Sequence, residues 1–162
     1  MRSVLLIGYG NPGRRDDGLG PMLATALESL RLPGVTVDSD YQLTVEDADA
    51  AARHDVVVFA DAAATGSEPF YFRRIAASGG CAFSSHAVEP GEVLTLAETL
   101  FKKTPEAYAL GIRGYEFGEF GEGLSGRAAA NLARAVEFAE RVIRAEAYAA
   151  SECGAESGDV VT

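Results

Sequence analysis

The chain has 162 residues, a length typical of a single domain. Its 24 acidic and 14 basic side chains give a net charge of −10, which argues against a general binder of nucleic-acid phosphates and against docking on anionic membranes. No apolar run approaches the ~20 residues that span a bilayer, so we expect no membrane insertion. The two cysteines, Cys81 and Cys153, predict no disulfide framework, and we expect a cytoplasmic protein.

Apolar residues alternate between two kinds of spacing along the chain. Unbroken or alternating apolar runs predict strands at residues 4–7, 35–40, 55–61, 70–75 and 108–112. Apolar residues three or four positions apart predict helices over residues 21–30, 44–53 and 90–105, and from a Ser125 cap through Ile143. This order predicts a single α/β domain over residues 1–145, with a twisted, mainly parallel or mixed sheet of about five strands and helices on both faces. Residues 146–162 carry four acids and no lysine or arginine, and we expect a disordered tail there.

A glycine-rich loop follows the first strand and allows two interpretations. Gly8, Gly10 and Gly13 have the spacing of a dinucleotide-binding loop, which places a helix N-terminus against a pyrophosphate. Here the helical spacing begins only near Pro21, after residues 14–17, whose two aspartates would repel a pyrophosphate. A dinucleotide-binding oxidoreductase is therefore the weaker interpretation.

The second interpretation is a metal site. Asp17 follows the first strand, Asp61 ends the third, and His86 lies beyond the strand at residues 70–75. In a parallel sheet these positions share the carboxyl edge, where open α/β sheets bind ligands. Two carboxylates and an imidazole hold a divalent first-row ion without selecting among nickel, zinc, cobalt and manganese. Each residue alone has a simpler interpretation, as a helix cap, a solvated turn or an exposed loop histidine.

A long motif resembles the opening signature of the hydrogenase maturation endopeptidases: GYGNPGRRDDGLG at residues 8–20. Two short segments, at residues 60–62 and 84–86, stand where that family has its second and third motifs, and the resemblance extends over residues 1–145 as an order of elements. It implies an endopeptidase that removes the C-terminal extension from the large-subunit precursor of a nickel–iron hydrogenase, after nickel has been inserted.

The resemblance also implies the site. Asp17, Asp61 and His86 match the family's metal-binding residues, although the first position is often Glu in the family. The implied metal is nickel supplied by the substrate, and no organic cofactor is expected. The implied partner is the precursor subunit, and we expect this protein to act as a monomer. Water activation by the metal and general-base catalysis by Asp16 or Asp40 remain alternatives. A non-catalytic metal-binding maturation chaperone is a further alternative to the endopeptidase.

Acidic and aromatic residues alternate in the glycine-rich segment Gly114–Gly123. Glu116, Glu119 and Glu122 recur every three residues there. We expect a mobile loop that helps to grip the partner near a basic C-terminal region. The simpler interpretation is a solvated loop packed in part on the last helix.

Overall fold

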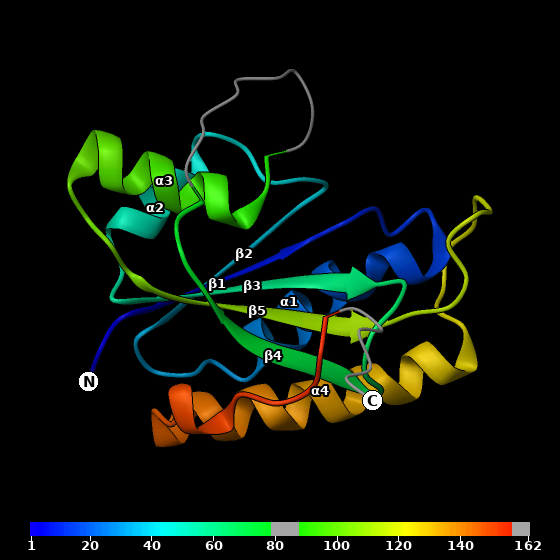
Figure 1. The fold of residues 1–162 in the computed structure, drawn as a ribbon. Helices are drawn as coiled ribbons and strands as arrows, with labels where there is room; N and C mark the ends of the chain where they lie inside the picture. The colour runs from blue at the N-terminus through cyan, green and yellow to red at the C-terminus, as the bar shows by residue number, and fades with distance from the viewer. Residues whose placement is uncertain (79–87, 157–162) are drawn as a thin grey trace, which may run out of the picture.

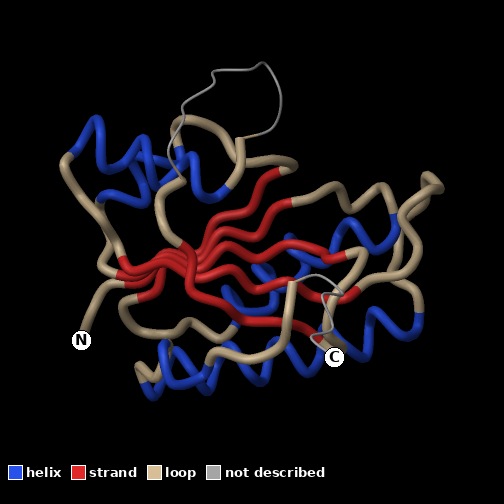
Figure 2. The backbone as a smooth tube through the Cα atoms, in the orientation of Figure 1, coloured by secondary structure: helices blue, strands red, loops and turns tan. Residues whose placement is uncertain are grey.

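The computed structural model describes residues 1–78 and 88–156. Strands and helices alternate and build a five-stranded sheet between helices (Figure 1 and Figure 2). The strands are β1 (Val4–Tyr9), β2 (Val35–Asp40), β3 (Val56–Ala63), β4 (Phe70–Ile75) and β5 (Glu106–Arg113). The helices are α1 (Leu19–Ser29), α2 (Asp47–Ala52), α3 (Pro90–Phe101) and α4 (Gly126–Ala145), with short 3-10 turns η1 (Arg15–Gly18) and η2 (Ala149–Ser151). Over the described part of the chain, no helix has the length and apolar character needed to cross a bilayer.

The strand order is β2-β1-β3-β5-β4. β1, β2, β3 and β5 are parallel, whereas β4 runs antiparallel to β5 at the sheet edge. The predicted single α/β domain with a mainly parallel or mixed sheet is therefore confirmed. We expected the chain to leave the strand at residues 70–75 at the carboxyl edge of the parallel strands, and this expectation is wrong. Ile75, at the end of β4, pairs with Ala107 near the start of β5, so the chain leaves β4 at the opposite edge of the sheet.

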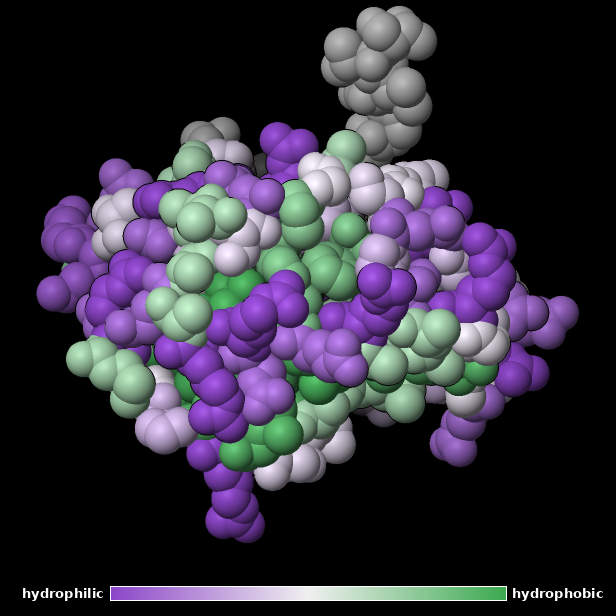
Figure 3. Space-filling view, turned by 90° about the horizontal axis from the view of Figure 1, so that it is seen from below, coloured by the Kyte–Doolittle hydropathy of each residue, from purple (hydrophilic) through white to green (hydrophobic). Residues whose placement is uncertain are grey.

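Helices cover both faces of the sheet, which explains why β1 is apolar throughout. Leu6 points into the core beneath α1 and α4, whereas Leu5 and Ile7 point into the core beneath α2 and α3. In Figure 1, α2 and α3 lie above the sheet and α4 lies below it. Hydrophilic side chains cover most of the surface on the α4 side, with smaller apolar areas between them (Figure 3).

The segment after α4 is packed, and the expectation of disorder is wrong for residues 146–156. Glu146 adopts a left-handed conformation, with φ of 49°, and turns the chain back after α4. Tyr148 is then 1% exposed and stacks on Tyr108, with ring centroids 5.7 Å apart. Cys153 and Phe72 exchange two backbone hydrogen bonds, at 2.8 and 2.9 Å, along the free edge of β4. This acidic segment is ordered because it buries an aromatic ring and pairs with an exposed strand edge.

Candidate active site

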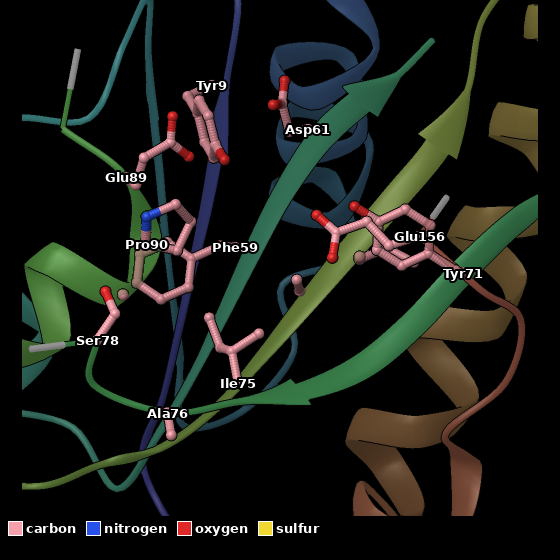
Figure 4. Close-up of a pocket in the computed structure, with 13 residues that line it drawn as sticks. Tyr9, Phe59, Asp61, Tyr71, Ile75, Ala76, Ser78, Glu89, Pro90 and Glu156 are labelled. Carbon is pink, nitrogen blue, oxygen red and sulfur yellow. The ribbon is translucent and has the colours of Figure 1, made fainter. Parts of the chain in front are cut away.

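A pocket of about 490 Å³ lies on the side of the sheet that carries α2 and α3 (Figure 4). Apolar side chains from three strands line its inner part: Phe59, Ile75 and Ala109. Polar side chains also face it, from β1, β3, β4, the start of α3 and the C-terminal segment: Tyr9, Asp61, Tyr71, Glu89 and Glu156. The pocket thus combines an apolar lining with several groups that exchange protons or donate hydrogen bonds, as enzyme sites commonly do.

Asp61 is the most perturbed carboxyl in this pocket. It follows the buried run of β3 and is only partly exposed. Burial is the largest of the causes that raise the pKa of its carboxyl to about 7, and the charges of Asp17 and Glu89 act in the same direction. Hydrogen bonds from the Ala62 N–H, at 2.8 Å, and from the Tyr9 hydroxyl act against this rise. A partly buried carboxyl with a strongly shifted pKa in a pocket is a candidate functional group.

Asp17 lies in η1, near the same edge of the sheet. Its Oδ2 accepts a hydrogen bond from the Asn11 N–H at 2.7 Å. Gly10, with φ of 141°, lets the loop close on itself, because a Cβ there would stand 2.1 Å from the Asp17 carbonyl oxygen. The charge of Asp17 is one of the causes that raise the pKa of Asp61.

His86 lies outside the described residues. The described residues on either side of its segment, Ser78 and Glu89, both line the pocket that contains Asp61. Within residues 1–78 and 88–156, no group of three or more His, Cys, Asp or Glu side chains is arranged to hold a metal ion. Asp17 and Asp61 carry carboxylates, a ligand type suited to a hard or borderline divalent ion, and the metal set of Asp17, Asp61 and His86 stays a prediction.

Asp16, the neighbour of Asp17, points into the protein. Its fully buried carboxylate accepts hydrogen bonds from the N–H groups of Tyr115 and Glu116, at 2.7 and 3.0 Å, and from the N–H and hydroxyl of Ser125, at 2.8 and 2.7 Å. Burial by itself would raise its pKa, but these hydrogen bonds outweigh burial and hold the pKa below its ordinary value. Because its lone pairs are occupied in this way, Asp16 is poorly suited to act as a general base.

The Gly114–Gly123 loop is attached to the residues before Asp16. The Gly121 N–H donates to the Gly13 carbonyl at 2.8 Å, and the Arg15 N–H donates to the Gly121 carbonyl at 2.9 Å. Phe120 projects beyond these contacts with 82% of its surface exposed, and the Arg14 guanidinium lies 5.0 Å from its ring centroid. Backbone hydrogen bonds at Glu116 and Gly121 thus tie both ends of the loop to residues 13–16, and the expected mobility of the loop stays a prediction.

Asp40 ends β2 and is exposed. Its Oδ1 accepts a hydrogen bond from the Tyr41 N–H at 2.7 Å, and it faces a separate hollow of about 190 Å³ together with Gly10 and Pro21. β1 lies between β2 and β3, so Asp40 and Asp61 are two strands apart. The structure therefore leaves Asp40 outside the pocket that contains Asp61, and Asp17 is not among the residues that line that pocket either.

Gly8, the first of the three glycines that suggested a dinucleotide loop, has a packing role together with Gly20. A Cβ on Gly8 would stand 2.1 Å from the Gly20 carbonyl oxygen, and a Cβ on Gly20 would stand 2.4 Å from the Tyr9 carbonyl oxygen. The first turn of α1 therefore lies directly against β1, with η1 inserted between strand and helix. This close approach accounts for Gly8 and Gly20 without a bound pyrophosphate.

Of the polar residues that face the pocket, only Asp61 was predicted from the sequence, and Tyr71 and Glu89 show why others were missed. Tyr71 comes from a strand whose partner and direction are unknown until the sheet is assembled. Glu89 begins α3, where it forms a capping box with Glu92, and its charge also reaches Asp61. The sequence pattern of a helix cap, Glu89 followed by Glu92, could have drawn attention to Glu89. No local sequence pattern distinguishes Tyr71 as a pocket residue.

The fold is that of the NiFe hydrogenase maturation proteases. The protease HycI from Thermococcus kodakarensis matches with a TM-score of 0.68 and 23% identity, over 88% of this chain and 92% of that chain. The maturating endopeptidase HybD from E. coli matches with a TM-score of 0.66 and 19% identity, over 90% and 94%. HybD from T. kodakarensis matches with a TM-score of 0.62 and 21% identity, over 86% and 98%. No protein-family model and no curated protein sequence matches the chain. The resemblance carried by residues 8–20 is thus confirmed at the level of the fold.

Proposed function

We propose that this protein is an endopeptidase that removes the C-terminal extension of a nickel–iron hydrogenase large-subunit precursor and recognises the nickel already inserted there. The observation that carries the proposal is the partly buried carboxyl of Asp61 in a pocket, with a raised pKa to which the charge of Asp17 contributes. It occurs in a fold shared with proteins that are themselves hydrogenase maturation proteases.

The two carboxylates suit a cation brought by the substrate. In the free protein, burial and the charge of Asp17 disfavour ionisation of Asp61. A divalent ion offsets both effects, so binding favours the ionised pair. We propose that Asp17, Asp61 and His86 complete the coordination of the nickel that the precursor holds through its cysteines. Binding through the metal places the scissile peptide bond beside the pocket, which converts binding energy into orientation.

Hydrolysis then requires a water molecule to add to the scissile carbonyl. Activation of this water by the bound nickel and activation by a carboxylate both fit the site. Of the carboxylates considered from the sequence, Asp16 is occupied by structural hydrogen bonds and Asp40 lies outside the pocket. Asp61 is therefore the carboxylate best placed for this role.

The wider proposal keeps what the sequence led us to expect. The protein acts as a monomer in the cytoplasm, with nickel supplied by the substrate and no organic cofactor. The alternative of a dinucleotide-dependent oxidoreductase loses support because Gly8 and Gly20 serve helix–strand packing. The alternative of a maturation chaperone predicts precursor binding without cleavage.

The test is a mobility-shift assay of precursor processing with the full chain. Wild type should process nickel-loaded precursor and leave nickel-free precursor intact. Asp17→Ala and His86→Ala should each suppress processing, because each removes one ligand from a shared coordination sphere. Asp49→Ala, which alters an exposed carboxylate on α2, is the matched control and should process normally.

Each result has a defined consequence. Equal processing of nickel-free precursor would refute recognition through nickel and leave the protease activity standing. Stable binding of loaded precursor without cleavage would favour the chaperone. Tight NAD binding with no processing would favour the oxidoreductase.

A further inference from the structure

A tyrosine ring lies flat on the sheet beside Asp61. Tyr71 on β4 is the direct cross-strand partner of Gly111 on β5. A Cβ on Gly111 would stand 2.2 Å from the Tyr71 Cε1 and Cζ atoms, a distance that no real contact reaches. The ring therefore occupies the space that any other residue at position 111 would fill, and only glycine there permits this position.

The cross-strand pairing that joins Tyr71 to Gly111 extends to Asp61, the candidate catalytic carboxyl. Gly111 is also the direct partner of Asp61 on β3, so Asp61, Gly111 and Tyr71 lie side by side on three neighbouring strands. The Tyr71 hydroxyl oxygen lies 2.6 Å from the position of a Gly111 Cβ. Neighbouring strands are about 4.8 Å apart, which puts the hydroxyl within roughly 7 Å of the Asp61 Cβ.

The Tyr71 hydroxyl is directed to the pocket although its ring is buried. The side chain is 9% exposed and lines the same pocket as Asp61. Figure 4 shows Tyr71 and Tyr9 on opposite sides of Asp61, with the Glu156 carboxylate near Tyr71. Among the described residues, no hydrogen bond fixes the Tyr71 hydroxyl. A donor held by a rigid ring and left free to face a ligand is suited to recognise a carbonyl oxygen.

We infer that Tyr71 is a further catalytic residue, whose hydroxyl donates a hydrogen bond to the carbonyl oxygen of the scissile peptide bond. The inference rests on the proposed endopeptidase function and adds a role for a residue outside the metal-binding set. Because the Tyr71 hydroxyl lies within roughly 7 Å of the Asp61 Cβ, one peptide group bound in the pocket can contact both side chains, with its oxygen toward Tyr71 and its carbon toward Asp61.

The chemical step assigns each atom. Water adds to the carbonyl carbon, and one of its protons passes to a carboxylate of the site. The electron pair of the carbonyl double bond moves onto the oxygen, where the hydrogen bond from Tyr71 strengthens as negative charge develops. The carbonyl then re-forms, the bond to nitrogen breaks, and the carboxylate returns the proton to the leaving amine. Tyr71 stays protonated throughout.

The experiment measures the steady-state kinetics of cleavage of nickel-loaded precursor by Tyr71→Phe. This substitution removes only the hydroxyl group and keeps the ring over Gly111. We expect kcat to fall about 100-fold, as for other oxyanion donors, with KM for nickel-loaded precursor unchanged. Tyr148→Phe is the matched control, because Tyr148 is buried on the opposite face of the sheet and its hydroxyl has no hydrogen-bond partner there among the described residues. Its kcat should equal that of wild type.

A second variant tests whether Gly111 holds the Tyr71 ring in place. Gly111→Ala should displace Tyr71 and lower kcat, and the double variant Tyr71→Phe/Gly111→Ala should lose little beyond Tyr71→Phe, because both changes remove one interaction. Thermal melting identifies any variant that fails to fold, and Tyr71→Phe then decides alone.

The outcomes separate this inference from the proposed function. Cleavage by Tyr71→Phe with the kcat of wild type, or with a raised KM as its only change, would overturn the inference and leave the endopeptidase standing. Failure of wild type to cleave any nickel-loaded precursor would overturn both.

Discussion

The Asp16 carboxylate fixes Ser125, which caps the N-terminus of α4. One carboxylate oxygen accepts from the Ser125 N–H at 2.8 Å and the other from its hydroxyl at 2.7 Å. Residues 109 positions apart are thereby joined at the edge of the sheet that carries Asp17. The adjacent Asp16 and Asp17 thus differ, since Asp16 accepts four hydrogen bonds that hold the loop structure and Asp17 accepts one, from the Asn11 N–H.

This difference predicts unequal losses of stability from two similar substitutions. Asp16→Ala should lower the free energy of unfolding by about 3 kcal/mol, because it leaves several buried donors without an acceptor. Asp17→Ala removes one hydrogen bond, from the Asn11 N–H, and should cost about 1 kcal/mol. Urea denaturation of both variants measures the contrast. Equal destabilisation would show that Asp16 does not have the structural role described.

The raised pKa of Asp61 predicts a pH-dependent stability in chelator-treated, metal-free protein. Its folded-state pKa of about 7 exceeds its ordinary value of 3.8, so the protonated form is favoured by folding. That contribution is complete below about pH 4 and is lost as the pH rises toward 7. Asp61→Asn should remove this loss and make the protein more stable than wild type at pH 8, by on the order of 2 kcal/mol. Urea denaturation at pH 5 and pH 8 checks this, and an unchanged pH dependence in the variant would contradict it.

Divalent ions should stabilise the free protein through the same two carboxylates. Added Ni²⁺, Zn²⁺ or Cd²⁺ should raise the melting temperature by several degrees, because an ion that binds only the folded state stabilises it. Asp61→Ala should lose most of this rise, whereas Asp49→Ala, on an exposed face of α2, should keep it. Equal rises in all three proteins would place the binding elsewhere.

The length of the carboxylate at position 17 is a further test. Asp17→Glu should retain precursor processing, because Glu often stands at the corresponding family position and keeps the charge near Asp61. The assay is precursor processing with nickel-loaded substrate, compared with Asp17→Ala. Loss of processing in both variants would show that the loop closed by Asn11 requires the shorter side chain.

The Gly114–Gly123 loop predicts a salt-dependent effect on partner association. Glu116 and Glu119 are exposed on a loop that is paired to residues 13–15 next to the candidate site. The double reversal Glu116→Lys/Glu119→Lys should slow association with the precursor, most strongly at low salt, if a basic segment of the precursor meets this loop.

The control for this charge reversal has the same net charge. Glu28→Lys/Glu98→Lys changes two exposed glutamates on α1 and α3, away from this loop. Stopped-flow association rates at low and high ionic strength compare the two variants. Equal association rates for the loop variant and wild type at low ionic strength would remove the loop from the interface.

The sequence by itself determined the order of strands and helices, because apolar spacing is a local property of the chain. It also determined the resemblance at residues 8–20, whose glycines are required where the first turn of α1 meets β1. The position of Asp61 at the end of β3, in the pocket, was predictable to the same extent, since open α/β sheets bind ligands at the carboxyl ends of their strands.

Only the tertiary structure decided the rest. The antiparallel direction of β4 depends on its pairing with β5, which is distant in sequence, and that pairing puts Tyr71 over Gly111. The burial of Tyr148 depends on an edge strand that the tail covers. The separate tasks of Asp16 and Asp17 depend on Ser125, which lies 109 residues away from Asp16. Local spacing specifies which segments form strands and helices, but neighbours brought together by folding set the direction, burial and hydrogen bonding of individual side chains.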